Sequence, residues 1–283
     1  MHPRLKQCLD HLAGYASVPK TISAVMKVVE DPNATPEDLA RLLEQDKNLV
    51  HLILRTANSA LYSLSGEIQN IRHAVTLLGF DTVRTLATVD TLKLLFDQFG
   101  VIERRIWEHC ALSGIVAARL ALNHVVQVDP GDAFMVGLLH DIGKVAINNT
   151  FRREYARVVA RAEATRSSIV VVERAQFGFD HAEAGEEVAK LWSLSDPIRI
   201  AIRYHHDSSV FAKLGETERK LTALAAVTSA CCSRLGIGCS EPIGRPDPDA
   251  LIAWVSLGLT ANDGSPVFQL VSEAARRGKE LLA

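Results

Sequence analysis

The sequence predicts an all-α protein, and three features of the 283-residue chain support this. Leucines and isoleucines recur at helical spacing between Leu39 and Ile53, with charged residues between them. Hydrophobic residues make up 48% of the chain and aromatic residues only 6%, as is typical of packed aliphatic helices. No stretch alternates polar and apolar residues convincingly over the length of a strand. The β-branched stretch "SSIVVVERA" is also interpreted as helical, because its neighbours are.

Start signals place several helices along the chain. Thr35 is expected to cap a helix that has Pro36 at its first position and acids in its first turn. Two more helices are predicted in "NIRHAVTLLGFDTVRTLATVDTLKLLF", with a bend or break at Gly79. Asp180 is expected to cap a helix in "HAEAGEEVAKLW", and Asp196 to open one in "DPIRIAIRYHHD". A final amphipathic helix is predicted in "SPVFQLVSEAARRGKELLA".

The chain has soft internal boundaries rather than clear linkers. The stretch "FDQFGVIERR" near residue 100 is the best internal joint, so residues 1–100 are expected to form an N-terminal helical layer and residues 101–236 a second bundle. Residues 237–283 are predicted to hold an irregular segment rich in glycine and proline, followed by the final helix. No long-period repeat or low-complexity tract interrupts this organisation.

Composition excludes several classes of protein. The formal net charge of −2 provides no broad field to attract nucleic acid or an anionic membrane. No apolar run approaches the roughly 20 residues that span a bilayer. Charges interrupt the N-terminus, so no signal peptide is expected, and the protein is predicted to be cytoplasmic. The cysteines are odd in number, form no CxxC pair and are expected to be reduced; they are Cys8, Cys110, Cys231, Cys232 and Cys239.

The stretch "GLLHDIGKVA" contains the main candidate for a functional site. His140 and Asp141 follow an apolar run with Phe134, Leu138 and Leu139, so both polar groups should emerge at the end of a buried helix. A buried carboxylate beside an imidazole needs a compensating partner, and a metal ion is one such partner. The His-Asp pair by itself is weak evidence, because such pairs also arise by chance.

Four further histidines lie on other predicted helices, which is how helical bundles assemble metal sites from facing side chains. Imidazoles together with a carboxylate suit iron, manganese, nickel or zinc. For any one of these histidines the alternative is an ordinary core or surface position, and spacing alone does not establish that they converge. The four residues are His109, His181, His205 and His206.

Several stretches of the chain, in one order, match a known family: "SVPKTISAVMKVVEDPNATPEDLARLLEQD", "LILRTANSALY", "WEHCALSGIVAARLA", "DAFMVGLLHDIGKVAI" and "IRIAIRYHHD". Over residues 15–236 the sequence resembles HDOD domains, bacterial signalling domains related to the HD superfamily of metal-dependent phosphohydrolases. The resemblance implies one all-helical unit, an HD-like multi-helix bundle with an N-terminal helical layer, which acts as a regulatory or output module. The family's Asn58-Ser59-Ala60 is interpreted as structural, with Asn58 bonding backbone groups at a helix end.

The same residues also resemble the HD-GYP branch, whose members use two or three metals to hydrolyse cyclic di-GMP. Through this resemblance, Lys144 matches a lysine that would neutralise phosphate charge. Two positions depart from the branch: Arg105 replaces an acid one turn before the first histidine, and Ser229 stands where the superfamily's closing aspartate should fall. The GYP signature is missing as well. The positions that match metal ligands are His109, His140, Asp141, His181, His205 and His206.

These departures weaken a two-metal site most of all. Anionic ligands hold two cations together and help to orient the attacking water. A serine and an arginine in place of two carboxylates remove two negative charges and add a positive one. One metal, held by His109, His140 and Asp141 with help from a further histidine, is compatible with the ligands that remain, as is a vestigial site without metal. Efficient phosphodiester hydrolysis is not expected.

The leading hypothesis is a bacterial signal-transduction module of the HDOD type that contacts signalling proteins and is biased by a metal or by a small ligand such as a nucleotide. The rival is a metal-dependent phosphohydrolase acting on cyclic dinucleotides or nucleotides, in which Asp141 and the histidines bind metal and Lys144 stabilises developing charge. A nucleic-acid-binding regulator lacks the basic footprint it would need. The number of bound ions separates these hypotheses: zero indicates a scaffold, one a sensory or structural site, and two a catalytic site.

Overall fold

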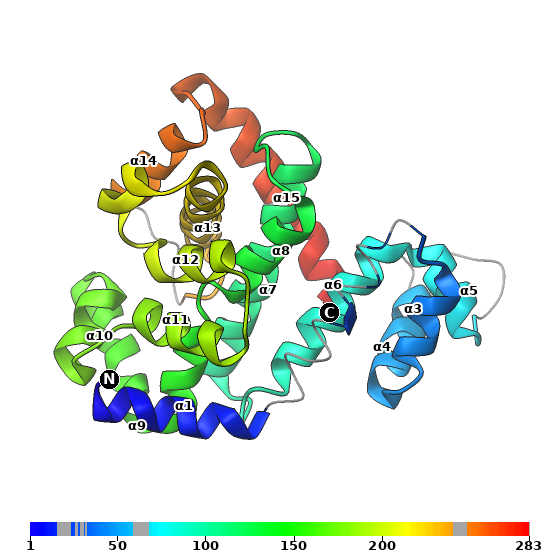
Figure 1. Ribbon diagram of the computed structural model, residues 1–283, viewed down its shortest axis with the longest axis horizontal. Helices are drawn as coiled ribbons and strands as arrows, with labels where there is room; N and C mark the ends of the chain where they lie inside the picture. Colours follow the sequence, from blue (N-terminus) through cyan, green and yellow to red (C-terminus); the bar gives the residue numbers. More distant parts are fainter. Residues whose placement is uncertain are drawn as a thin grey trace. The chain divides into compact units, whose positions relative to one another are not determined.

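The computed structural model describes residues 1–15, 33–58, 68–239 and 248–282, together with Ala24, Val25, Val28 and Asp31. Within these residues every regular element is an α-helix or a 3-10 helix, and no strand occurs (Figure 1). The predicted all-α fold class is therefore confirmed. The stretch "SSIVVVERA" contributes to helix α10 (Ile169–Phe177), as its neighbours suggested. All five cysteines are free, so the expectation of no disulfide framework is confirmed.

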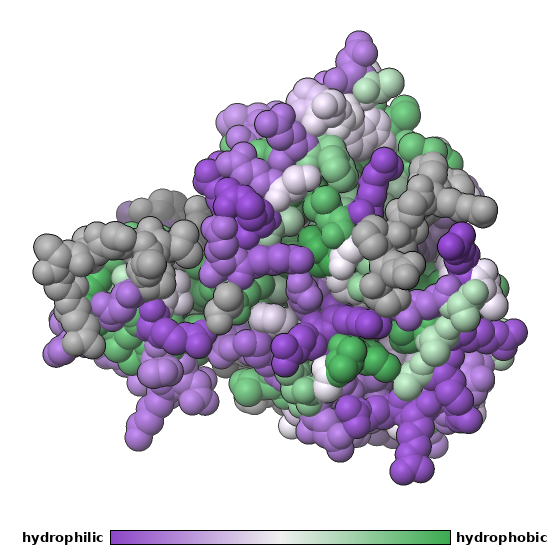
Figure 2. Space-filling model, turned by 180° about the vertical axis from the view of Figure 1, so that it is seen from behind, coloured by the Kyte–Doolittle hydropathy of each residue, from purple (hydrophilic) through white to green (hydrophobic). Residues whose placement is uncertain are grey.

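The described helices include none that is both long and apolar enough to cross a membrane. On the face in Figure 2, hydrophilic side chains are interspersed with smaller hydrophobic patches.

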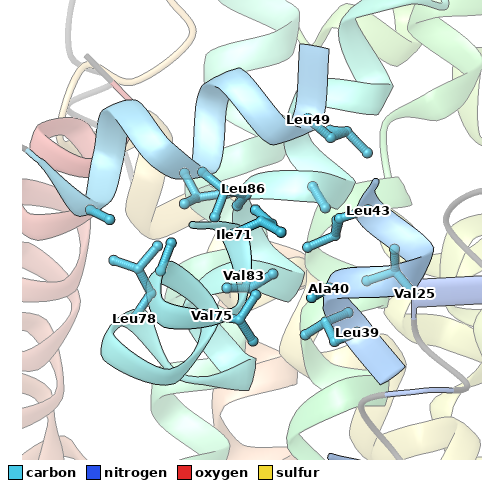
Figure 3. Packing of buried hydrophobic residues seen from close by; sticks show 14 of the residues in the cluster. Val25, Leu39, Ala40, Leu43, Leu49, Ile71, Val75, Leu78, Val83 and Leu86 are labelled. Atoms are coloured by element: carbon cyan, nitrogen blue, oxygen red, sulfur yellow. The ribbon is translucent and has the colours of Figure 1, made fainter. Parts of the chain in front are cut away.

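The chain packs as two compact units, and the smaller consists of Tyr15–Leu95 with Glu280–Ala283. A cluster of aliphatic side chains forms the core of this unit (Figure 3). Leu39, Leu43 and Val75 are fully buried there, which stabilises the helices because apolar surface is removed from water. The helices are α3 (Pro36–Leu43), α4 (Lys47–Ala57), α5 (Ile71–Leu78) and α6 (Phe80–Lys93).

The predicted helix boundaries in this unit are confirmed. The Thr35 hydroxyl accepts a hydrogen bond from the Asp38 amide at 3.3 Å, and the Asp38 carboxylate accepts one from the Thr35 amide at 3.0 Å, which is a capping box. Pro36 occupies the first position of α3. Gly79 separates α5 from α6 with a φ of 77°, a backbone conformation that favours glycine over other residues.

Asn58 follows the last residue of α4 and ties the returning chain to it. Its side-chain nitrogen donates to the backbone oxygens of Leu54 at 2.9 Å and Ile68 at 2.8 Å, and its side-chain oxygen accepts from the Ile68 amide at 2.7 Å. The interpretation of Asn58 as a structural residue that bonds backbone at a helix end is confirmed. Ser59 and Ala60 lie outside the described residues.

Asn58→Ala is expected to lower the free energy of unfolding by about 1 kcal/mol, because three hydrogen bonds to backbone groups are lost at a partly exposed position. Urea unfolding of the purified chain measures this change. Asn48→Ala is the control, since Asn48 lies on the same helix and is exposed. Equal losses in the two variants would contradict the structural role of Asn58.

The larger unit consists of Met1–Gly14 and Phe96–Lys279. Its long helices α7 and α9 pack with α8, α11 and α13, and α10 and α12 lie beside α9 and α11 (Figure 1). The final amphipathic helix predicted from the sequence forms as α15. The helices that lie wholly or mostly in this unit are α1 (Pro3–Leu12), α7 (Val101–Leu122), α8 (Pro130–Leu139), α9 (Ile142–Thr165), α10 (Ile169–Phe177), α11 (His181–Leu191), α12 (Asp196–Tyr204), α13 (Glu216–Arg234), α14 (Pro248–Ser256) and α15 (Gly264–Leu282), with short 3-10 helices η1 (Ala13–Tyr15), η2 (Ser208–Lys213) and η3 (Ala261–Asp263).

Helix α1 packs against α9 and α11 within this larger unit. The Arg4 guanidinium lies 4.2 Å from the ring centre of Phe151 and 4.9 Å from that of Phe177, and it pairs with Glu154 at 2.8 Å. Such cation–π contacts hold α1 in place in addition to its buried leucines. The division of the chain at residues 100 and 236 stays a prediction.

Glu103 is a buried carboxylate that joins α7 to α9. It is 2% exposed and accepts hydrogen bonds from Asn148 at 2.9 Å, from Arg152 at 2.8 Å and from the Gly100 amide at 3.0 Å. Burial alone would raise the pKa of this carboxyl, but the hydrogen bonds from Arg152 and Asn148 lower the pKa to about 2.

The pKa of Glu103 predicts a specific dependence of stability on pH. Because the folded-state pKa lies below the unfolded value, the stabilisation is complete above about pH 4.5 and is lost as the pH falls toward 2. Glu103→Gln is expected to cost about 2 kcal/mol at pH 7, since half-exposed Arg152 is partly screened by water. In urea unfolding at a series of pH values, this difference should shrink below pH 4.5. A difference that stays constant down to pH 2.5 would contradict it.

Candidate metal centre

His140 and Asp141 lie at the junction of two helices in the larger unit. His140 directly follows α8, and Asp141 directly precedes α9. The two residues are 0% and 1% exposed. The apolar helix before them, α8, also buries Phe134, Leu138 and Leu139. Both polar groups therefore emerge at the end of a buried helix, as the sequence predicted.

The structure brings the six predicted residues together from separate helices. His109 lies on α7, His181 begins α11, and His205 and His206 follow α12. Two groups form around the shared Asp141, and within each group the candidate ligand atoms lie within 4.8 Å of one another. We call them the His109 group, made of His109, His140 and Asp141, and the His181 group, made of Asp141, His181, His205 and His206.

Two glycines allow the helices that carry these residues to approach closely. A Cβ atom on Gly143 in α9 would overlap the carbonyl oxygen of His181 and lie 2.6 Å from the Gly185 amide in α11. A Cβ atom on Gly137 in α8 would overlap the backbone of Ser113 in α7. The glycine of the His-Asp-Ile-Gly motif therefore places α9 against α11, which brings Asp141 next to His181.

Asp141 bridges the two groups with its two oxygens. Oδ2 lies 3.4 Å from His140 Nε2, 3.6 Å from His109 Nε2 and 2.6 Å from Lys144 Nζ. Oδ1 lies 3.1 Å from His181 Nε2 and 3.7 Å from the same nitrogen of His205. One carboxylate thus serves both halves of the cluster.

Backbone carbonyls fix the orientation of three imidazoles. His109 Nδ1 bonds the oxygen of Ile237 at 3.2 Å, His140 Nδ1 that of Gly137 at 2.8 Å, and His205 Nδ1 that of Ile202 at 2.9 Å. A carbonyl only accepts, so each Nδ1 carries the proton, and a neutral ring then points an Nε2 lone pair at the cluster. Burial lowers the pKa of all three histidines and keeps them neutral.

Glu173 on α10 is a part of the centre that sequence reasoning missed. It is fully buried, and its Oε2 accepts hydrogen bonds from His181 Nδ1 at 2.6 Å and from the His181 amide at 2.9 Å. Its Oε1 accepts one from the Tyr155 hydroxyl at 3.0 Å. The only sequence signal was an acid directly after the β-branched run "IVVV". Burial alone would lower the pKa of His181, but the Glu173 carboxylate raises it to about 9.

Asp141 and Lys144 hold each other in their charged forms. Burial alone would raise the pKa of the Asp141 carboxyl, but the Lys144 ammonium and the surrounding histidines hold it well below its usual range. The pKa of Lys144 is raised in turn, because Asp141 outweighs the effect of burial. The lysine that resembles a phosphate-binding residue is therefore already paired with a carboxylate.

Unsatisfied polar atoms test whether these residues fit a metal ion. Asp141 Oδ1 and His205 Nε2 are both buried, and neither makes a hydrogen bond of acceptable geometry. Buried polar atoms without partners are costly, and a cation between them would satisfy both. Imidazole nitrogens with a carboxylate oxygen are also ligands that iron, manganese, nickel and zinc accept. The residues present therefore fit a divalent transition metal.

Ser229 and Arg105 occupy the positions where acids were expected from the HD-GYP resemblance. Ser229 on α13 places its hydroxyl oxygen 3.2 Å from His109 Nε2, so it does lie at the cluster. Arg105 instead pairs with Glu163 on α9 at 3.4 Å. In the ligand groups found among the described residues, Asp141 is the single carboxylate.

Comparison with known proteins decides the family. A model of the HDOD domain matches residues 16–208, about two thirds of the chain. The chain belongs to the HDOD family. This confirms the resemblance inferred from the sequence.

Solved structures share the fold over most of the chain. An HDOD domain protein of unknown function from Geobacter sulfurreducens is 27% identical, with a TM-score of 0.73 over 98% of both chains. A candidate phosphohydrolase from Shewanella amazonensis SB2B is 22% identical, with a TM-score of 0.66 over 97% of this chain and 98% of the other. An uncharacterized protein of Treponema pallidum is 23% identical over 70% of this chain. That match spans only 39% of the Treponema protein's length.

Proposed function

We propose that this HDOD protein is a regulatory module that acts through contacts with signalling proteins, binds one divalent transition metal and does not hydrolyse phosphodiesters efficiently. The observation that carries this proposal is the charge of the cluster. Among the described residues Asp141 is the single carboxylate in the ligand groups, Lys144 is already paired with it at 2.6 Å, and Ser229 stands where a closing acid would lie.

Electrostatics disfavours a second ion. Two divalent ions would bring four positive charges next to the ammonium of Lys144, against the two negative charges of Asp141 and buried Glu173. Like charges at such separations repel strongly where water is excluded. Without a pair of ions the centre lacks the two-metal clamp that stabilises both the attacking and the leaving oxygen of an in-line displacement. One ion is compatible with the charges present.

The comparisons support a signalling role through the family and the fold. A candidate signal-transduction protein from Marinobacter aquaeolei VT8 shares the fold with a TM-score of 0.69 and 21% identity, over 94% of this chain and 58% of its own. We propose signalling proteins as partners, a cytoplasmic location, and a nucleotide as one class of small ligand that could bias the module.

Assays with cyclic di-GMP, other cyclic dinucleotides and nucleotides test the lack of catalysis. The wild-type protein loaded with manganese or iron is expected to show no more turnover than the His140→Ala variant. Turnover in the ordinary enzyme range, about 1 per second or faster, that disappears in His140→Ala would sink the proposal.

The second candidate function is a metal-dependent phosphohydrolase, favoured by the convergence of all six ligand positions with Lys144. Complementation of a deletion strain separates the two functions. If the protein is a regulatory module, the Lys144→Met variant, which lacks the cation that would neutralise phosphate, should restore function in the deletion strain. If the protein is a phosphohydrolase, the same variant should fail to restore function.

A further inference from the structure

From the geometry of the cluster we infer that the single ion binds in the His181 group, and that Glu173 is the positioning residue of this site. This inference rests on the proposed function, which specifies one ion but not its place. It differs from the expectation that His109, His140 and Asp141 provide the principal ligands.

The two halves offer different numbers of donors. The His181 group combines one carboxylate oxygen with three imidazole nitrogens, which is enough for a four-coordinate ion. The His109 group combines one carboxylate oxygen with two imidazole nitrogens, and the part of the chain that the structure describes supplies it with no fourth ligand. Ser229, a neutral hydroxyl, occupies the place beside His109.

The two oxygens of Asp141 are used differently. Oδ2, which faces the His109 group, already pairs with the Lys144 ammonium at 2.6 Å, so an ion there would compete with a positive charge. Oδ1, which faces the His181 group, makes no hydrogen bond of acceptable geometry, and the nitrogens near it, His181 Nε2 at 3.1 Å and His205 Nε2 at 3.7 Å, are candidate ligands of the same ion. The oxygen of the shared carboxylate that Lys144 does not occupy therefore faces the His181 group.

One histidine nitrogen of the His181 group repeats this difference, although His206 Nε2 and His181 Nε2 lie 3.1 Å apart, within hydrogen-bond distance. His205 Nε2 has no hydrogen-bond partner, although it is buried and its Nδ1 donates to a backbone carbonyl. In the His109 group, His109 Nε2 has the Ser229 hydroxyl at 3.2 Å as a potential donor. A lone pair without a donor is ready to bind a cation, whereas a lone pair that accepts from a hydroxyl must first give up that bond.

A second negative charge lies behind the His181 group only. Glu173 bonds His181 Nδ1 at 2.6 Å and is itself held by the Tyr155 hydroxyl, so the imidazole is fixed with Nε2 toward Asp141. A carboxylate behind a ligating histidine orients the ring and makes it a stronger donor. Behind the His109 group, by contrast, His109 and His140 bond neutral backbone carbonyls.

The decisive experiment compares two matched histidines, His205 and His109. Both are buried, both donate from Nδ1 to a backbone carbonyl, and each belongs to one group only. The metal-free chain is titrated with Co²⁺ and Zn²⁺, and the bound Co²⁺ is followed by its visible absorption. The His205→Ala variant is expected to bind the ion more than roughly 100-fold more weakly than wild type. The His109→Ala variant is expected to keep one ion, with an affinity within about threefold of wild type and an unchanged absorption spectrum.

Loss of the ion in His109→Ala with retention in His205→Ala would overturn the inference, as would equal loss in both variants. A wild-type chain that binds no ion at all would instead overturn the metal part of the proposed function. Circular dichroism checks that each variant folds. If His205→Ala does not fold, His206→Asn takes its place, with the same expected loss of metal affinity. His206 is less buried than His205, so this substitution disturbs the core less.

Glu173→Gln tests the positioning role with the shape of the side chain preserved. Affinity for Co²⁺ is expected to fall about 10- to 100-fold, with a shift of the absorption bands because His181 becomes a weaker donor. Glu103→Gln is the matched control: it removes another buried carboxylate of the same unit and should change neither affinity nor spectrum. Unchanged Co²⁺ binding in Glu173→Gln, or equal changes in both variants, would overturn the role of Glu173.

Discussion

Asp141→Asn is expected to weaken metal binding more than roughly 100-fold and to lower the free energy of unfolding of the metal-free chain by about 3 kcal/mol. Asp141 is the carboxylate shared by both ligand groups, so its loss removes the single carboxylate among the candidate ligands that the described residues provide. The substitution also leaves the Lys144 ammonium, whose side chain is 19% exposed, without its counter-charge. A charge left unpaired in such surroundings is strongly destabilising.

Titration with Zn²⁺ and urea unfolding without metal measure the two effects of Asp141→Asn separately. Glu103→Gln serves as the control, because it also removes a buried carboxylate and should lower stability while leaving metal affinity unchanged. Wild-type affinity in Asp141→Asn would show that the ion binds elsewhere.

Gly143→Ala is expected to lower the free energy of unfolding by about 3 kcal/mol and to weaken metal binding together with it. The added methyl group would overlap the His181 carbonyl and approach the Gly185 amide, both of which are backbone atoms that cannot rotate away. Helices α9 and α11 must therefore separate, and His181 moves away from Asp141. The effect reaches the metal centre although Gly143 contributes no ligand.

Gly264→Ala is the matched control for Gly143→Ala. A Cβ atom there meets nothing within 4 Å, and the residue has ordinary helical angles of −57° and −48°. The free energy of unfolding of the Gly264→Ala variant should rise by less than about 1 kcal/mol. Thermal unfolding of both variants gives the comparison, and a neutral Gly143→Ala would show that α9 and α11 are not held in contact at this glycine.

Local signals in the sequence were sufficient for much of the fold. Helical spacing of aliphatic residues, the capping residue Thr35 and the break at Gly79 are short-range features, and the structure confirms each. Asn58 is similar, since two of its three hydrogen bonds go to the far end of one short connection. Such features depend on residues that are close along the chain.

The arrangement within the metal centre could not be predicted from the sequence. Glu173 follows a β-branched run, and nothing local indicates that it points at His181 eight residues later. The pairing of Lys144 with Asp141 and the free Oδ1 depend on how α9, α11 and α12 pack. The candidate ligands were identified from a resemblance spread over residues 15–236, whereas the difference between the two ligand groups could be seen only in the structure.

The number of metal ions per chain tests the central claim most directly. Elemental analysis of protein purified after growth with added iron and manganese, combined with a concentration from amino-acid analysis, gives this number without a substrate. The charges around Asp141, Lys144 and Glu173 predict one ion per chain. Two ions per chain, with hydrolysis of a cyclic dinucleotide that depends on both, would contradict the account.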